Sequence, residues 1–525
     1  MFADLRIQNN FYKKFLFLFL ASILFIFYIY VASNTYGYDD EFNTIKIIES
    51  LDFRNMYRYL QSSDIHPPLS YLINKLLFNI LKDWNLVRAV LSSFVVLSII
   101  NLAYSRYKIN KNSSILLLLF LGFDPNIIMW GTSIRWYTYF IIILNWYLII
   151  PNRNSIWFYL KQIIGLILLG YTGYIFILLI PPLFIYYNCS PLKAFKGNFS
   201  KILITYASFI FLYSYQFFIF VTVHLQTKAA GGNYGFPLKK IFIGIISGVF
   251  SNQGVMPFSY AGIISIISFA FILFCIIKKS MNENQFFDLS QVYILAIATF
   301  ILSGVPGFVR ILVILIPFKA LLLSSFEIKK LSYQLACIIL ILSQLQGFSN
   351  VISHSGTTKA YWNIPHKEIF RELEVQSKSC PKDLVVVHHD QAMSFHLNKK
   401  QYISISPFEN SFGPSVKNIL KESPYHNKND LNQIFNSKNI NCVVVVDTFR
   451  GINGFPYEQK IKLLNAVENL NYKSLKSFNF GKNNDIRLNR IFTKDYPEYR
   501  ANIRLFKDVS NISELRVWEN LLQSP

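Results

Sequence analysis

The feature that most constrains this chain is an apolar run from Phe15 to Ala32 that follows a basic N-terminus. A bilayer core of about 30 Å takes roughly 20 apolar residues in a helix, so this run can cross a membrane. It is longer than the usual apolar region of a cleaved signal peptide, and we expect an uncleaved signal anchor. Cleavage near Ala32-Ser33 is the alternative. In both cases residues from 34 onward lie outside, and the N-terminus is cytoplasmic.

Apolar blocks of similar length recur over the first two thirds of the chain, which is 53% hydrophobic and only 15% charged. Lys and Arg are retained on the cytoplasmic side of short loops, so the basic loops set the sidedness of each span. The run 241–250, within 225–258, is interpreted as interfacial or re-entrant, because a crossing there would put Lys278-Lys279 outside. We predict a polytopic α-helical membrane protein with about eleven transmembrane helices. They are expected at 15–32, 88–105, 113–130, 135–150, 158–171, 174–188, 202–223, 259–277, 291–305, 308–325 and 331–348.

The net charge of +22 does not indicate nucleic-acid binding. Lys and Arg are spread through short loops and the C-terminal part, and they do not line one helix or groove. They are better explained as topology signals.

From about residue 355 the composition becomes that of a soluble domain. Uninterrupted apolar runs at 384–387 and 442–446 predict buried strands of a parallel sheet. Helical patterns near 363–376 and 456–470 accompany them, so this part is predicted to be an α/β domain.

Two domains follow from these patterns. Residues 1–348 form the transmembrane domain, with an outer loop at 34–87, and residues 349–525 form a soluble α/β domain on the extracytoplasmic side. Cys380 and Cys442 lie in the second domain and would be able to pair in an oxidising compartment.

Three consecutive acidic residues, Asp39, Asp40 and Glu41, follow the first span by a few residues. Neighbouring carboxylates repel one another and are costly beside an apolar boundary, unless they hold a metal, bind a polar substrate or act as a general base. The alternative is a solvated loop that caps a helix starting near Phe42, since Asp is favoured there. Both interpretations stay open from the residues alone.

Three further elements are predicted on the same outer face. His66 precedes paired prolines, which fix its place at the start of a helix, although a lone histidine is more often structural. Arg135 follows a turn that contains Asp124-Pro125, and snorkelling to the interface is its alternative explanation. Arg310 begins a span on the outer side, against the positive-inside trend, and such a cation favours a lipid phosphate or a protein carboxylate as partner.

Carboxylates, a histidine and two arginines are thus expected on one face of the membrane, beside spans that can admit a lipid tail. The economical hypothesis is an anionic lipid-linked substrate and a general base. A transporter or flippase of lipid-linked substrates is a second hypothesis, but its charges would sit near the midplane and not at one interface. A glycan polymerase or ligase is a third, although such enzymes centre on a late outer loop.

The motifs resemble those of the polytopic glycosyltransferases of the GT-C fold, which take sugars from polyprenyl-phosphate donors. More narrowly, they resemble the bacterial branch related to protein O-mannosyltransferases and to aminoarabinose and lipopolysaccharide-core sugar transferases. Residues 38–41 match the family's Asp-Glu pair in the first outer loop, and 66–69 match its His-Pro-Pro-Leu element. Residues 133–137 are similar to its Arg-x-Tyr element, and 310–317 to its arginine-led late span.

The resemblance implies an integral enzyme of the bacterial inner or plasma membrane that acts on a cell-envelope glycan. It implies Asp40 as the general base, supported by Glu41, with Asp39 as the competing choice because three acids stand where the pattern needs two. Arg310 would bind the donor phosphate, and His66 and Arg135 would assist it.

One departure from the pattern bears on the acceptor. Protein mannosyltransferases carry another aspartate shortly after the arginine that Arg135 resembles, whereas residues 136–140 here contain no acid. Asp124 would replace it as the second acid, or no second acid is used. A lipid or glycan acceptor is therefore favoured over a protein. The leaving phosphodiester is already anionic, so no cofactor is required, although a divalent metal is compatible with the site. Inversion at the anomeric carbon is expected.

Overall fold

The structure is a computed structural model of the chain. The residues that it describes are 2–34, 39–62, 66–107, 110–152, 155–189, 199–224, 260–282, 289–303, 313–325, 331–352, 384–388, 403–405, 442–448, 472–480 and 501–508.

The chain divides into two compact units. The first comprises Met1–Thr35 and Ile47–Ser355, and the second comprises Tyr36–Lys46 and Gly356–Pro525. The second unit thus begins close to the composition change near residue 355, and it also takes in the segment with the acidic residues. Each unit is described by itself below.

The first unit is helical. Its first half contains α1 (Phe2–Asn34), the end of α2 (Asp39–Ser50), α3 (Phe53–Ser62), α4 (Leu69–Leu81), α5 (Trp84–Tyr107), α6 (Lys111–Leu117), the π-helix η1 (Leu118–Gly122), α7 (Pro125–Gly131) and α8 (Trp136–Tyr147). Its second half contains α9 (Ile156–Thr172), η2 (Tyr174–Leu179), α10 (Ile180–Phe184), η3 (Ile185–Cys189), α12 (Phe199–Ile219), η4 (Phe220–His224), α14 (Tyr260–Asn282), α15 (Leu289–Ser303), η6 (Val313–Leu315), α17 (Ile316–Ser325) and α18 (Leu331–Ile352).

Four helices are long and apolar enough to cross a membrane: Phe11–Asn34, Trp84–Tyr107, Phe199–Thr222 and Leu331–Ser349. A fifth span results if Lys111–Gly122 and Pro125–Gly131, which meet at a bend of 60°, are counted as one. The prediction of a helical integral membrane protein is therefore confirmed. The remaining predicted spans fall on shorter helices, so the count of eleven stays a prediction. The segment 225–258 lies outside the described residues.

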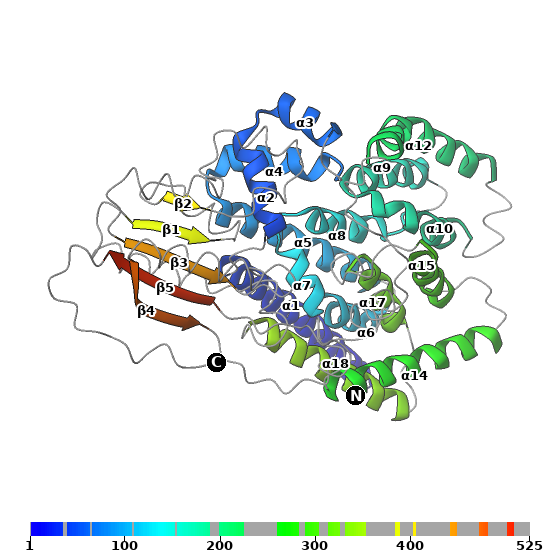
Figure 1. The fold of residues 1–525 in the computed structure, drawn as a ribbon. Helices are drawn as coiled ribbons and strands as arrows, with labels where there is room; N and C mark the ends of the chain where they lie inside the picture. The colour runs from blue at the N-terminus through cyan, green and yellow to red at the C-terminus, as the bar shows by residue number, and fades with distance from the viewer. Residues whose placement is uncertain are drawn as a thin grey trace. The chain divides into compact units, whose positions relative to one another are not determined.

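Neighbouring helices pack in the order α1, α5, α8, α9 and α12, while α17 packs against α6 and α15 (Figure 1). Close approach of α9 to α8 depends on a glycine. A Cβ at Gly165 would lie 2.1 Å from Cδ2 of Tyr147, so any larger residue would push the two helices apart. Tyr147 is itself fully buried.

The helices that follow the acidic segment form a small core of their own. Ile48, Met56, Leu60 and Tyr71 come from the end of α2, from α3 and from α4, and all four are buried. Trp84 Nε1 donates to Glu49 Oε1 at 2.8 Å, which also ties the end of α2 to α5. The helix expected after the paired prolines is α4, and its apolar character was not predicted for the outer loop 34–87.

The second unit contains a five-stranded sheet in the order β2-β1-β3-β5-β4 (Figure 1). The strands are β1 (Leu384–His388), β2 (Ile403–Ile405), β3 (Cys442–Thr448), β4 (Tyr472–Phe480) and β5 (Ala501–Asp508). β1 pairs in parallel with both β2 and β3, as the apolar runs predicted, whereas β5 runs antiparallel between β3 and β4. The helices predicted at 363–376 and 456–470 lie outside the described residues, as does Cys380, so the α/β class and the disulfide stay predictions.

Candidate functional site

The acidic residues stand at the start of a helix. Asp39 and Asp40 are the first two residues of α2, and Glu41 is fully buried. This position agrees with the capping interpretation, since negative charge is favourable at a helix N-terminus. It does not conflict with the catalytic interpretation. All three belong to the second unit, and their relation to the first unit's residues is therefore not described.

His66 and Arg135 lie in contact within the first unit. Arg135 Nη2 is 2.9 Å from His66 Nε2, although 69 positions separate the residues in sequence. A guanidinium only donates, so His66 Nε2 must accept, and the ring's own proton is then on Nδ1. The ring of Trp136 lies 6.0 Å from the His66 ring. Two residues predicted to bind donor phosphate are therefore neighbours.

Each of these two residues stands at a helix start. Pro68 precedes the first residue of α4, and the Leu72 N–H donates to its carbonyl at 3.0 Å. Arg135 is the N-cap of α8, has an extended backbone and is only 6% exposed. A buried arginine needs hydrogen-bond acceptors or an anion around it, because its charge is costly to desolvate.

A second contact holds α4 against α8 beside this pair. Tyr139 Oη donates to Asn74 Oδ1 at 2.6 Å, and Asn74 Nδ2 donates to the carbonyl of Ile134 at 3.5 Å. Asn74 is fully buried. The asparagine thus joins the helix that follows His66 to the residue that precedes Arg135. Sequence reasoning missed it, because one asparagine in an apolar helix carries no motif.

The turn between α7 and α8 is closed by side-chain hydroxyls. Ser133 Oγ and Thr138 Oγ1 lie 2.8 Å and 3.1 Å from the carbonyl oxygen of Trp130, and Thr138 Oγ1 lies 2.5 Å from that of Ser133. The rings of Trp130 and Tyr137 meet edge to face at 5.5 Å. These contacts fix how Arg135 leaves the end of α7.

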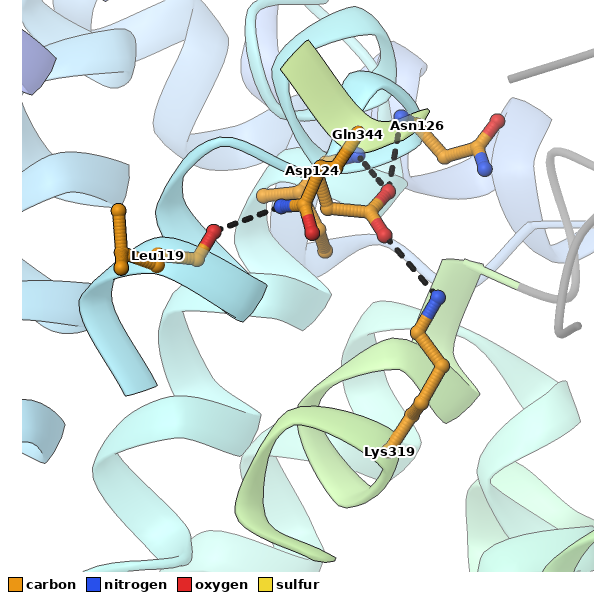
Figure 2. Close-up of polar contacts among 6 residues, drawn as sticks. Leu119, Asp124, Asn126, Lys319 and Gln344 are labelled. Carbon is orange, nitrogen blue, oxygen red and sulfur yellow. Dashed lines mark hydrogen bonds and ion pairs between the residues drawn. The ribbon is translucent and has the colours of Figure 1, made fainter. Parts of the chain in front are cut away.

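Asp124 and Lys319 form a buried ion pair at the other end of α7. Lys319 Nζ is 3.2 Å from Asp124 Oδ2, and the two side chains are 1% and 0% exposed. The same carboxylate accepts the backbone N–H of Asn126 at 2.9 Å and of Ile127 at 3.4 Å, so it also caps α7 (Figure 2). Asp124 therefore satisfies a helix start and neutralises a cation at once.

The backbone next to Asp124 is supported by two more helices. Figure 2 shows Gln344 of α18 beside Leu119, where its Nε2 donates to the carbonyl oxygen at 2.6 Å. Tyr28 of α1 donates to the carbonyl oxygen of Gly122 at 3.0 Å. Carbonyls that a broken helix leaves unpaired must find partners inside a membrane protein. Here the Leu119 carbonyl accepts from the Phe123 N–H at 3.3 Å and gains a second bond from α18, and the Gly122 carbonyl gains one from α1.

Lys319 was not singled out from the sequence. It lies inside the predicted span 308–325, where an ionisable residue is rare and marks a functional or paired position. That signal was present and was overlooked. Arg310, in contrast, lies outside the described residues. The element that follows it, η6, packs against α7 and α8.

The described residues were also compared with the requirements of a metal site. Over the parts of the chain that the structure describes, no group of three or more His, Cys, Asp or Glu side chains is placed to hold a metal ion. Side chains of Asp39 and Asp40 are outside this description.

Comparisons with known proteins complete the description. No family model matches the chain, and no curated protein matches it. Among solved structures, the chain is similar to the crystal structure of ArnT from Cupriavidus metallidurans bound to undecaprenyl phosphate. The similarity covers 93% of this chain and 97% of that one, with a TM-score of 0.49 and 9% sequence identity. At this level the similarity supports no conclusion about function.

Proposed function

We propose that this chain is a membrane glycosyltransferase that moves a sugar from a polyprenyl-phosphate donor to an acceptor on the outer face of the membrane. The observation that carries the proposal is the contact of Arg135 Nη2 with His66 Nε2 at 2.9 Å. It joins two residues that the family resemblance implies assist phosphate binding, in a unit that also contains four helices long and apolar enough for a bilayer. Residues 38–41 supply the acids that such a reaction needs.

In the proposed reaction the acceptor hydroxyl oxygen attacks the anomeric carbon of the donor sugar. The bond from that carbon to the phosphate oxygen breaks, and its electron pair leaves with polyprenyl phosphate. Asp40 takes the hydroxyl proton as the new carbon–oxygen bond forms, with Glu41 or Asp39 in support. A single displacement of this kind inverts the configuration at the anomeric carbon.

Arg310, Arg135 and His66 are proposed to hold the donor phosphate. An arginine fork matches the geometry of phosphate oxygens and stabilises the charge that grows on the leaving group. Because His66 accepts from Arg135 through Nε2, the ring's proton is on Nδ1 and the imidazole is neutral. The pair therefore keeps one positive charge, that of Arg135, for the phosphate.

The acceptor is proposed to be a lipid or glycan. Asp124, the residue offered as a second acid, already caps α7 and pairs with Lys319. Proton uptake by Asp124 would break this ion pair and weaken the helix cap. We therefore favour a mechanism with the acids of α2 alone, and no step is assigned to Asp124.

Transfer from purified protein in lipid nanodiscs to a set of lipid and glycan acceptors tests the proposal, with polyprenyl-phosphate sugars as donors. Asp40→Asn should reduce kcat at least about a hundredfold with little change in donor KM, since it removes the base. Arg135→Gln should raise donor KM instead. Glu49→Gln is the matched control, because Glu49 is an exposed carboxylate of the same helix and accepts a hydrogen bond from Trp84 Nε1. Full transfer by Asp40→Asn would refute the assignment of the base.

The transporter hypothesis is separated by the same preparation. A flippase would move lipid-linked sugar across liposomes without making a new glycosidic bond. Movement of a fluorescent lipid-linked sugar together with no transferred product, over all donors tried, would favour that class.

A further inference from the structure

The pair formed by Asp124 and Lys319 stands where an apolar segment breaks. The segment Lys111–Gly122 and the segment Pro125–Gly131 meet at 60°, and Asp124 is the N-cap of the second. Figure 2 shows its carboxylate between the backbone nitrogens at the start of α7 and the ammonium of Lys319 on α17. The break is therefore held from both sides.

Stability alone does not account for this pair. Burying two charges costs desolvation that their attraction roughly offsets, and well-packed apolar residues often serve as well or better. An ion pair instead fixes the relative position of its two partners, because displacement of either one would leave a buried charge unpaired. The pair thus specifies where α7 starts relative to α17.

A rigid segment joins Asp124 to Arg135, so a displacement of Asp124 would also move Arg135. Every residue of α7 is buried, and so are Thr132, Ser133 and Ile134. The hydroxyl contacts of Ser133 and Thr138 with the carbonyl of Trp130 close the turn that follows. Packed interiors shift as units and do not absorb small displacements. A shift at the start of α7 is therefore passed to the N-cap of α8.

The anchor on the other side is equally fixed. Residues Ile316 to Ser324 of α17 are all buried, and η6, which leads into α17, packs against α7 and α8. Lys319 thus projects from a helix with little room to move.

We propose that Lys319, with Asp124, is a positioning residue that sets the place of Arg135 beside His66. The inference rests on the proposed function only in giving Arg135 a phosphate to bind. Loss of the pair displaces the guanidinium from the imidazole and weakens donor binding, while the base on α2 is unaffected. Neither Lys319 nor Asp124 takes part in proton transfer.

The test uses the double variant Asp124→Asn/Lys319→Met in the full chain. Asn keeps the hydrogen bonds of the helix cap, and removal of both charges leaves none unpaired, so this variant should fold. The first readout is the 15N spectrum of histidine-labelled protein, in which His66→Gln identifies the His66 signals among the eight histidines. The double variant should move the His66 signals, and Lys319→Arg should keep them at the wild-type position.

A control at a half-buried lysine separates positioning from general damage. Lys161 on α9 donates to the carbonyl of Ile149 just beyond the other end of α8. Lys161→Met should lower the unfolding temperature and leave the His66 signals in place. If it moves those signals as far as the double variant does, the pair has no special role and the inference fails.

The second readout is kinetic. The double variant should raise donor KM at least about tenfold with kcat within about twofold, since small misplacements of a binding group are expensive. In an Arg135→Gln background the same change should add nothing further to donor KM. Additive effects would show that Lys319 does not act through Arg135.

The two proposals fail in different ways. Moved His66 signals in the double variant, together with no sugar transfer by the wild-type protein, would refute the proposed function and leave the positioning role standing. Active transfer by the wild-type protein, with His66 signals and donor KM both unchanged in the double variant, would refute the positioning role alone.

Discussion

Tyr139 donates a hydrogen bond of 2.6 Å to Asn74, a residue 65 positions earlier in the chain, and both side chains are buried. Asn74 in turn reaches the carbonyl of Ile134. This contact ties α4 to α8 close to the pair of His66 and Arg135. It supports that pair by fixing the packing of α4 on α8.

Tyr139→Phe removes the donor and leaves the Asn74 oxygen buried without that partner. We expect a loss of about 1 to 3 kcal/mol in the free energy of unfolding, because a buried polar atom left unsatisfied bears its full desolvation cost. Thermal unfolding in detergent measures it. Tyr30→Phe, at a side chain that is 49% exposed, should stay within about 0.5 kcal/mol of wild type. Equal effects of both variants would show that the Tyr139 contact contributes nothing.

Gln344→Leu tests the support of the broken segment. Without the amide, the carbonyl oxygen of Leu119 loses its 2.6 Å bond and keeps the longer one from the Phe123 N–H at 3.3 Å, so a destabilisation of about 0.5 to 1.5 kcal/mol should follow. Gln346→Leu is the control on the same helix, since Gln346 is exposed. If the two variants unfold at the same temperature, the contact between Gln344 and Leu119 is not part of the folded state.

Gly165→Ala should destabilise the protein although alanine is the better helix former. Alanine gains about 1 kcal/mol from helix propensity, but its Cβ would lie 2.1 Å from Tyr147 Cδ2. Overpacking of this kind costs about 1 to 3 kcal/mol, so the unfolding temperature should fall. At Gly131 the nearest atom is Val95 Cγ1 at 3.2 Å, and Gly131→Ala should be tolerated better. A higher unfolding temperature for Gly165→Ala would contradict the packing of α8 and α9.

Burial lowers the pKa of Lys46, near the end of α2, from 10.5 to about 8. Between these two values the unfolded chain holds a proton that the folded protein lacks. Stability should therefore rise with pH across this interval, and below about pH 8 the charged, partly buried amine is a cost. Lys46→Met should flatten this part of the pH profile of unfolding, whereas Lys82→Met, at an exposed lysine, should keep it. If the stability of Lys46→Met rises with pH as steeply as that of wild type, Lys46 does not cause this pH dependence.

The sequence predicted some of these relationships and could not predict others. His66 and Arg135 were placed on one face because the basic loops fix the sidedness of the spans beside them. Their direct contact needed the packing of α4 on α8, which no local pattern encodes. Asn74 belongs to no motif. Lys319 lies in the same predicted span as Arg310, and only Arg310 was singled out there.

Span prediction succeeded for the long helices and was less secure for the broken ones. Hydropathy finds Trp84–Tyr107 easily, because it is one straight apolar helix. The bend at Asp124 is invisible to hydropathy, since Pro125 and Asn126 look like ordinary interruptions until their partners on other helices are known. The two strands at 384–387 and 442–446 were recognised because uninterrupted valines favour a buried sheet. The position of β5 between β3 and β4 was not predicted, because it depends on pairing between strands far apart in the sequence.

The position of β5 has a consequence for how this sheet is made. β3 and β4 are synthesised first, yet each meets β5 and not the other in the finished sheet. Until residues 501–508 have emerged from the ribosome, β3 presents an open edge of unpaired backbone groups. The five-stranded sheet can therefore form only after β5 has emerged. A chain interrupted before β5 would leave that edge available to other proteins.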